Sequence, residues 1–222
     1  MGRLGASAPA AAEATRILAI RHGQTAWNAD SRIQGHTDIG LDAVGAWQAR
    51  RLAQALAGED LQAVYSSDLS RARGTAEPLA QAKGLATQVD HGLRERAFGE
   101  FEGLSFAQIE QRWPEQALAW RRRDPDFGAR GGEVLRAFRE RVVATVTRLA
   151  RAHPGQGIAL VTHGGVLDLL YREAMRVALD APRAWQLPNA SVNRLLHAGD
   201  GLVLVGWADV RHLEDGPPTR TL

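Results

Sequence analysis

Residues 17–23 read ILAIRHG, and residues 158–165 read IALVTHGG. Each stretch is an apolar run with the length of a buried strand, followed by one polar residue, a histidine and glycine. Parallel sheets bind ligands beyond the carboxyl ends of their strands, so we expect His22 and His163 to meet at such an edge. The glycine after each histidine permits a positive φ or a close backbone approach, which would expose the ring and the amide N–H groups of the turn. The alternative is that each histidine is an ordinary residue at the end of a strand.

Strand-like and helix-like stretches alternate along the rest of the chain. Strands are predicted at 17–20, 61–67, 85–90, 157–165, 190–199 and 201–209. Helices are predicted at 41–58, at 68–84 with a bend at Pro78, after a capping box at Ser105 and Gln108, from Pro114, at 133–152 and at 166–179. This alternation predicts an α/β fold, a three-layer α/β/α sandwich with a largely parallel central sheet.

Length and composition indicate one domain and exclude several function classes. The chain has 222 residues, of which 45% are hydrophobic, and we expect a single domain at 16–213, an irregular cap at about 91–132, and tails at 1–15 and 214–222. The N-terminal tail is expected to be disordered. With no cysteine, disulfides and cysteine-based metal sites are excluded, and a net charge of +2 with no lysine-rich run argues against nucleic-acid binding. No apolar run approaches the length of a membrane span, so we expect a cytoplasmic protein without membrane contact.

Cationic side chains accompany the two histidines. Arg21 precedes His22, and Arg71 follows the predicted strand at 61–67 in the first turn of a helix. A guanidinium binds a phosphate through two parallel, charge-assisted hydrogen bonds, so this cluster predicts a site for a dianion. The alternative for Arg71 is a place on a solvated helix face.

Four motifs then connect the chain to a known family. RHGQTAWN, YSSDLSRARGTAE, LRERAFGEFEG and VTHGG, in this order, resemble the histidine phosphatase superfamily of phosphoglycerate mutase-like enzymes over residues 17–210. The resemblance implies that His22 becomes phosphohistidine and that phosphoryl oxygens are bound around it. The residues implied for that binding are Arg21, Arg71, His163, Gly164 and Asn28, with Thr25 and Gly35 in the adjacent substrate loop.

The resemblance also implies that Glu95 is the general acid and then the general base. Phosphomonoester cleavage needs a proton for the leaving alkoxide and a base for the attacking water, which one carboxyl group can provide in turn. Its neighbours Arg94 and Arg96 would hold it as an ion pair unless the extended backbone directs alternate side chains to opposite sides. The alternative for Glu95 is therefore a surface ion pair, with Glu100 and Glu102 as substitute acids. The histidines outside the motifs are interpreted as surface or loop residues: His36, His91, His153, His197 and His212.

Three functions share these motifs. The preferred one is a metal-independent phosphatase of the broad-specificity branch, acting on a small phosphorylated metabolite without a cofactor, as a monomer or homodimer. The first alternative is a phosphoglycerate mutase primed by 2,3-bisphosphoglycerate, in which Arg121, Arg122 and Arg123 would hold substrate rather than cover a solvated helix. The second is a non-catalytic module that binds phosphorylated proteins. The order of preference reflects the compact chain, the GGE at 131–133 and the intact motif residues.

Overall fold

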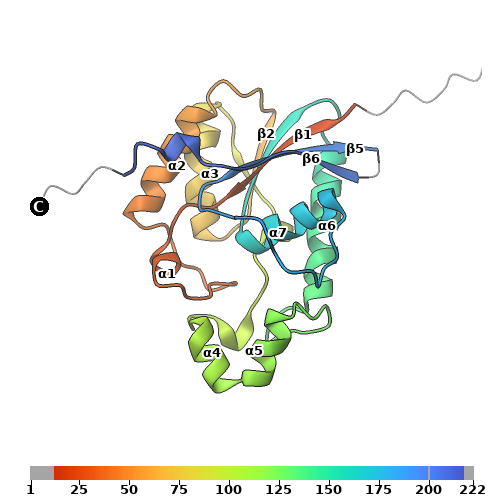
Figure 1. Cartoon of the computed structure of the whole chain (residues 1–222). Helices are drawn as coiled ribbons and strands as arrows, with labels where there is room; N and C mark the ends of the chain where they lie inside the picture. The colour runs from red at the N-terminus through yellow and green to blue at the C-terminus, as the bar shows by residue number, and fades with distance from the viewer. Residues whose placement is uncertain (1–12, 200, 218–222) are drawn as a thin grey trace, which may run out of the picture.

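A computed structural model describes residues 13–199 and 201–217. The predicted fold is confirmed: one mixed six-stranded sheet has the order β3-β2-β4-β1-β5-β6, and helices cover both of its faces (Figure 1). The strands are β1 (Thr15–Arg21), β2 (Ala63–Ser66), β3 (Thr87–Val89), β4 (Gly157–Thr162), β5 (Val192–Ala198) and β6 (Gly201–Asp209). The first four run parallel, and β5 and β6 pair antiparallel at one side of the sheet.

The α-helices of the described residues are α1 (Ala26–Ala29), α2 (Ala43–Ala55), α3 (Ser70–Ala82), α4 (Phe106–Arg112), α5 (Pro114–Arg121), α6 (Leu135–Arg151) and α7 (Gly164–Met175). Six of these seven helices lie close to the predicted ranges, and the short α1 lies where the sequence predicts no helix. Ser105 and Gln108 form the predicted capping box, and Pro114 begins α5. Helix α3 continues through Pro78. Helix α7 begins two residues earlier than predicted, directly after His163, and ends at Met175 instead of reaching 179.

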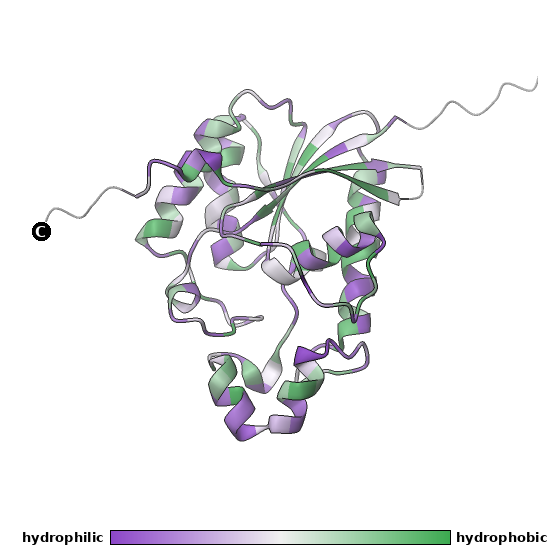
Figure 2. Cartoon of the chain, viewed as in Figure 1, coloured by the Kyte–Doolittle hydropathy of each residue, from purple (hydrophilic) through white to green (hydrophobic). Residues whose placement is uncertain are grey.

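Alternate residues of the central strands enter two separate cores. Ile17 and Ala19 of β1 face α6 and α7, whereas Leu18 and Ile20 face α2 and α3. This is the period of two that a strand buried on both faces requires. Figure 2 shows the helices with both hydrophobic and hydrophilic residues, as expected when one face of each helix lies in a core.

The segment predicted as an irregular cap contains its own small core. Phe101, Ile109 and Ala117 are buried there, with Trp113 and Trp120 packed against them. Figure 1 shows α4 and α5 below the layered body of the domain.

The ends of the domain differ slightly from the predicted bounds. Strand β1 begins at Thr15, which is buried, one residue before the predicted domain start. Asp215 still contacts the body of the domain through an ion pair with Arg51. Residues 1–12 and 218–222 of the predicted tails lie outside the described residues.

Candidate active site

The two histidines are brought together by strand pairing. Arg21 pairs with Thr162 in the register of β1 and β4, so His22 and His163 follow adjacent positions of neighbouring strands. Their ring centroids lie 5.2 Å apart, and both side chains are buried. The predicted meeting of the histidines is therefore confirmed, and strand register is its physical cause.

Both imidazoles are neutral in the folded protein. Burial lowers the pKa of His22 well below 6.5, and the charges of Arg21 and Arg71 lower it further. Burial followed by the charge of Arg71 does the same for His163. His22 Nδ1 lies 2.7 Å from the carbonyl oxygen of Gly23, and because a carbonyl only accepts, Nδ1 carries the proton. His22 Nε2 is then left with a free lone pair.

The guanidinium groups around His22 are held by backbone carbonyls. Arg21 Nη1 donates to Leu187 O, and Arg71 donates to Gly35 O at 2.7 Å and to Thr37 O at 3.1 Å. Burial lowers the pKa of Arg21 to about 10, so its charge persists at neutral pH. Within the described residues, four buried nitrogen atoms nearby have no hydrogen-bond partner: Arg21 Nε, Arg71 Nε, His163 Nδ1 and His163 Nε2. Unpaired polar groups are costly in a protein interior, and an anion could accept hydrogen bonds from the two arginine N–H groups and from the one protonated nitrogen of the neutral His163 ring.

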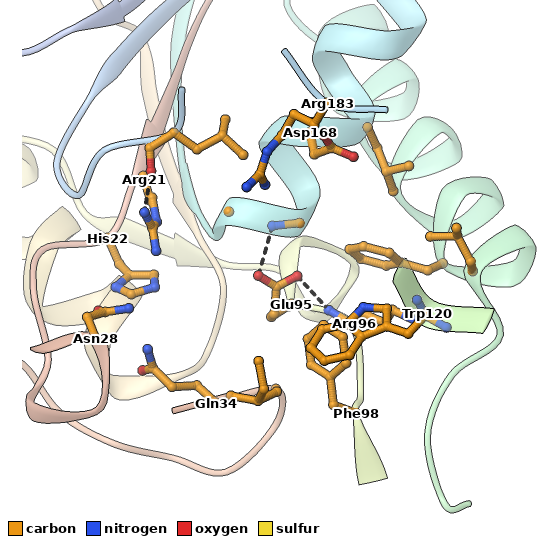
Figure 3. A pocket seen from close by; sticks show the side chains of 18 of the residues that line it. Arg21, His22, Asn28, Gln34, Glu95, Arg96, Phe98, Trp120, Asp168 and Arg183 are labelled. Atoms are coloured by element: carbon orange, nitrogen blue, oxygen red, sulfur yellow. Dashed lines mark hydrogen bonds between the residues drawn. The ribbon is translucent and has the colours of Figure 1, made fainter. Parts of the chain in front are cut away.

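A pocket of about 630 Å³ opens at this edge of the sheet, a volume typical of small-molecule sites (Figure 3). Its lining includes Arg21, His22, Asn28, Gly35, Arg71, Glu95 and Gly164 among the predicted residues. Figure 3 shows Arg21, His22 and Asn28 on one side of Glu95, and Phe98 and Trp120 on the other.

Glu95 faces this pocket, and the alternative of a surface ion pair is wrong. Its carboxylate accepts hydrogen bonds from the backbone N–H groups of Arg96 and Gly165, each at 2.8 Å. Arg94 instead pairs with Asp68, and Arg96 donates to the carbonyls of Glu133 and Phe127. The guanidinium groups on either side of Glu95 thus bind other groups, although Arg96 lines the same pocket as Glu95 and does not point to the opposite side.

Two glycines permit close approaches rather than unusual backbone angles. A Cβ on Gly165 would lie 2.1 Å from Glu95 Oε1, and a Cβ on Gly23 would lie 2.7 Å from the carbonyl oxygen of Gly45. Neither Gly23 nor Gly165 has a positive φ. Of the two glycine roles that the sequence left open, Gly23 shows close packing, whereas Gly164, which directly follows His163, shows neither: its φ is not positive and a Cβ there would lie 3.5 Å from Arg21 Nε.

Two predicted binding residues have supporting positions. Thr25 is fully buried and does not line the pocket; its hydroxyl accepts from Asn28 N–H as the N-cap of α1. Gly35 has φ +54°, lines the pocket, and directs its carbonyl to Arg71. We therefore correct the substrate-contact prediction for Thr25 and interpret Gly35 as orienting Arg71.

The carboxylate of Glu102, the substitute acid, is occupied by hydrogen bonds that stabilise the fold. Burial raises its pKa, but hydrogen bonds from Thr37, His36 N–H and Phe98 N–H outweigh burial and leave the pKa below its ordinary value. Glu100 lies outside the pocket lining. Neither residue has the position of Glu95.

Several residues that support the site were not predicted from the sequence. His36 was interpreted as a simple loop residue, but its Nε2 donates to Glu95 O at 2.8 Å, and Arg141 donates to the same carbonyl at 3.2 Å. Asn189 donates to His22 O at 3.0 Å and to Asn28 Oδ1 at 3.2 Å. These contacts join residues 46 to 167 positions apart, and no local pattern marks them.

The three arginines at 121–123 have different positions. Arg121 and Arg122 are exposed, and Arg121 pairs with Glu110. Arg123 lines the pocket and donates to Asp168 at 2.5 Å and to Leu179 O at 2.9 Å. The solvated-face interpretation thus holds for two of the three residues.

The fold and this site define a family. The sequence matches the histidine phosphatase superfamily (branch 1) over residues 17–210, and the chain belongs to it. The chain is 39% identical to phosphoglycerate mutase-like protein 4 of Arabidopsis thaliana over 90% of this chain and 87% of that one. It is 36% identical to the metal-independent phosphoserine phosphatase of the same plant, over 90% and 84% of the two chains.

Solved structures agree with the sequence relatives. A mycobacterial glucosyl-3-phosphoglycerate phosphatase in complex with VO3 superposes with a TM-score of 0.78 and 32% identity, over 86% of this chain and 98% of that one. These comparisons confirm the predicted family and support a phosphatase of small phosphorylated metabolites.

Within residues 13–199 and 201–217, three or more His, Cys, Asp or Glu side chains nowhere gather as a metal site would require. Over the same residues, each helix is too short or too polar to cross a membrane.

Proposed function

We propose that this protein hydrolyses phosphomonoesters through a phosphohistidine formed on His22 Nε2. The observation that carries the proposal is the free lone pair of a neutral His22, surrounded by Arg21, Arg71 and the unpaired nitrogens of His163. A neutral imidazole can attack phosphorus near pH 7, while fixed cations and hydrogen-bond donors stabilise the charge on the equatorial oxygens.

The reaction would proceed in two balanced steps. In the first, His22 Nε2 forms a bond to phosphorus as the P–O bond to the leaving group breaks, and Glu95 donates its proton to the leaving oxygen. In the second, Glu95 accepts a proton from water, water oxygen bonds to phosphorus, and the P–N bond breaks to release phosphate and neutral His22. The positive charge comes from the protein's own side chains, so we propose that neither step needs a metal. A cytoplasmic location is part of the proposal.

Phosphoglycerate mutase activity is the second candidate, because several relatives bear phosphoglycerate mutase names. The structure gives little support to a cluster of substrate-binding arginines at 121–123. Only Arg123 lines the pocket, and its charge is already paired with Asp168. Efficient conversion of 3-phosphoglycerate to 2-phosphoglycerate with catalytic 2,3-bisphosphoglycerate would favour the mutase over the phosphatase.

The experiment is hydrolysis of p-nitrophenyl phosphate in EDTA by the parent and by His22→Ala. We expect activity in the parent and a loss of at least about 10³-fold in the variant, because the nucleophile belongs to a group of residues that act together. His91→Ala is the matched control, since the His91 side chain is 75% exposed and lies outside the pocket. Acid quenching during turnover should trap phosphate on His22. Activity of His22→Ala within tenfold of the parent would refute the covalent mechanism.

A further inference from the structure

A cation without a partner lines the pocket away from His22. Arg183 lies between α7 and β5, is exposed, and has no hydrogen bond or ion pair within the described part of the chain. Figure 3 shows its side chain entering the pocket beside Asp168, across from His22 and Asn28. Its charge contributes to the lowered pKa of Arg21 and of Arg123, which places it within electrostatic range of both.

The segment that directly follows Arg183 is held by contacts at residues 185–187. Trp185 stacks on Tyr171 with ring centroids 4.0 Å apart. Trp207 Nε1 donates to Gln186 O at 3.0 Å, and the next carbonyl, of Leu187, accepts from Arg21. The same segment that completes the surroundings of Arg21 thus places Arg183 at the rim of the pocket.

Asp168 supplies a buried acceptor beside this cation. Its side chain is only 4% exposed, and Oδ2 accepts from Arg172 Nε at 2.9 Å and from Arg123 Nη2 at 2.5 Å. The other oxygen, Oδ1, is buried and finds no hydrogen-bond partner among the residues that the structure describes, although Asp168 lines the pocket. A carboxylate oxygen in this position can accept a hydrogen bond from an ammonium or hydroxyl group.

We propose that Arg183 and Asp168 together recognise the leaving group of the substrate, Arg183 binding a carboxylate and Asp168 Oδ1 accepting from an ammonium or hydroxyl group next to it. This inference rests on the proposed function, because the ester to be cleaved must lie at His22. The preferred substrates are therefore phosphate esters of small 2-amino or 2-hydroxy acids. A second phosphate fits less well than a carboxylate, because its double negative charge would lie close to the Asp168 carboxylate.

The test compares two substrates that differ only by a carboxylate, O-phosphoserine and phosphoethanolamine. The parent should prefer phosphoserine in kcat/KM. Arg183→Gln should lower the ratio of the two kcat/KM values by about 10- to 100-fold, the range of one charge-assisted hydrogen bond. Arg50→Gln is the matched control, because Arg50 is exposed on α2 and outside the pocket. A ratio that stays within twofold in Arg183→Gln, or a parent without preference, would overturn the proposal.

A second variant examines Asp168. Asp168→Asn should lower kcat/KM for phosphoserine relative to the phosphate ester of 3-hydroxypropionate, which has the carboxylate but no ammonium group. Because both rates are measured on one variant, a general structural defect would lower them together and leave the ratio unchanged. An unchanged ratio in a folded Asp168→Asn protein would remove Asp168 from the proposal.

A binding measurement separates this proposal from the proposed function. Calorimetry on His22→Ala should show tighter binding of phosphoserine than of phosphoethanolamine, and the difference should shrink in His22→Ala with Arg183→Gln. If the parent hydrolyses neither of these esters nor p-nitrophenyl phosphate but this difference in binding appears, the proposed function fails and the recognition site stands. If turnover occurs without the difference in binding or in kcat/KM, the recognition site is refuted and the phosphatase stands.

Discussion

The two ends of the pocket are built in different ways. The phosphate end, defined here as Arg21, His22, Arg71 and His163, is placed by strand ends and one helix start. The rim, defined as Trp120, Arg123 and Arg183, comes from the cap and from the segment between α7 and β5. The phosphate end depends on the register of a parallel sheet, whereas the rim depends on contacts between segments distant in sequence.

Because the two ends are built separately, one fold can keep the same phosphoryl-transfer chemistry while the preferred substrate changes. Changes at the phosphate end should alter turnover of every ester, because they act on the transferred group. Changes at the rim should alter the relative rates of different esters. Four experiments test whether the two ends of the pocket, and the surface outside it, have the different roles described here.

The largest effect is expected from Glu95→Gln. An amide cannot donate or accept the proton, so kcat should fall by about 10²- to 10⁴-fold for an alkyl phosphate such as phosphoserine. The loss should be smaller for p-nitrophenyl phosphate, whose leaving group needs less help from an acid. Equal losses on both esters would show that Glu95 does not protonate the leaving oxygen. Steady-state kinetics with the two substrates makes the measurement.

The next effect comes from Gly165→Ala. The new Cβ would lie 2.1 Å from Glu95 Oε1, so the carboxylate must move. A misplacement of about 1 Å can cost about 10²-fold in rate, and we expect kcat to fall by about that factor. Gly58→Ala is the matched control, because its Cβ would meet nothing within 4 Å. Parent-like kcat in Gly165→Ala would show that the close approach is not needed for turnover.

A smaller effect is expected on the pH dependence of the free energy of unfolding. Burial keeps the pKa of His22 and His163 well below 6.5 in the folded protein, whereas the unfolded chain binds protons there near pH 6.5. The unfolded state therefore holds more protons below pH 6.5, and the free energy of unfolding should fall as the pH drops. The slope approaches about 1.4 kcal/mol per pH unit for each histidine.

Urea unfolding of the parent and of His163→Gln between pH 7.5 and 5.5 measures this slope. The variant should show a shallower dependence than the parent, because one titrating group is gone. Gln88→Ala, an exposed substitution that removes no titratable group, should keep the parent's slope. Identical slopes in parent and His163→Gln would contradict the buried neutral imidazole.

The smallest effect is expected from Arg121→Gln. Arg121 and Glu110 form an ion pair with side chains 55% and 51% exposed, outside the pocket. Such pairs contribute little, so the free energy of unfolding should change by less than about 1 kcal/mol and kcat/KM by less than twofold. Thermal denaturation and phosphoserine turnover check both values. A tenfold loss of kcat/KM would instead show that Arg121 takes part in substrate binding.

The sequence predicted the elements and the phosphate end well. The apolar runs before His22 and His163 marked two buried strands, and hydrogen bonding between neighbouring parallel strands then forced the two rings together. The capping box at Ser105 and Gln108 and the proline at 114 marked the cap helices, because these signals act within a few residues. The family resemblance implied a substrate role for Thr25, and only the fold shows that Thr25 caps α1.

By itself, then, the sequence determined the α/β fold, the edge of the sheet that holds the site, and the cationic character of that site. These follow from local periodicity and from the fixed geometry of parallel strands. Tertiary contacts decide that Glu95 faces the pocket while the guanidinium groups of Arg94 and Arg96 bind other partners, and that Arg183 and Asp168 line the same pocket. The direction of a side chain in an irregular segment depends on contact partners that are far away in the chain. A short stretch of sequence does not include those partners, so it cannot predict the direction.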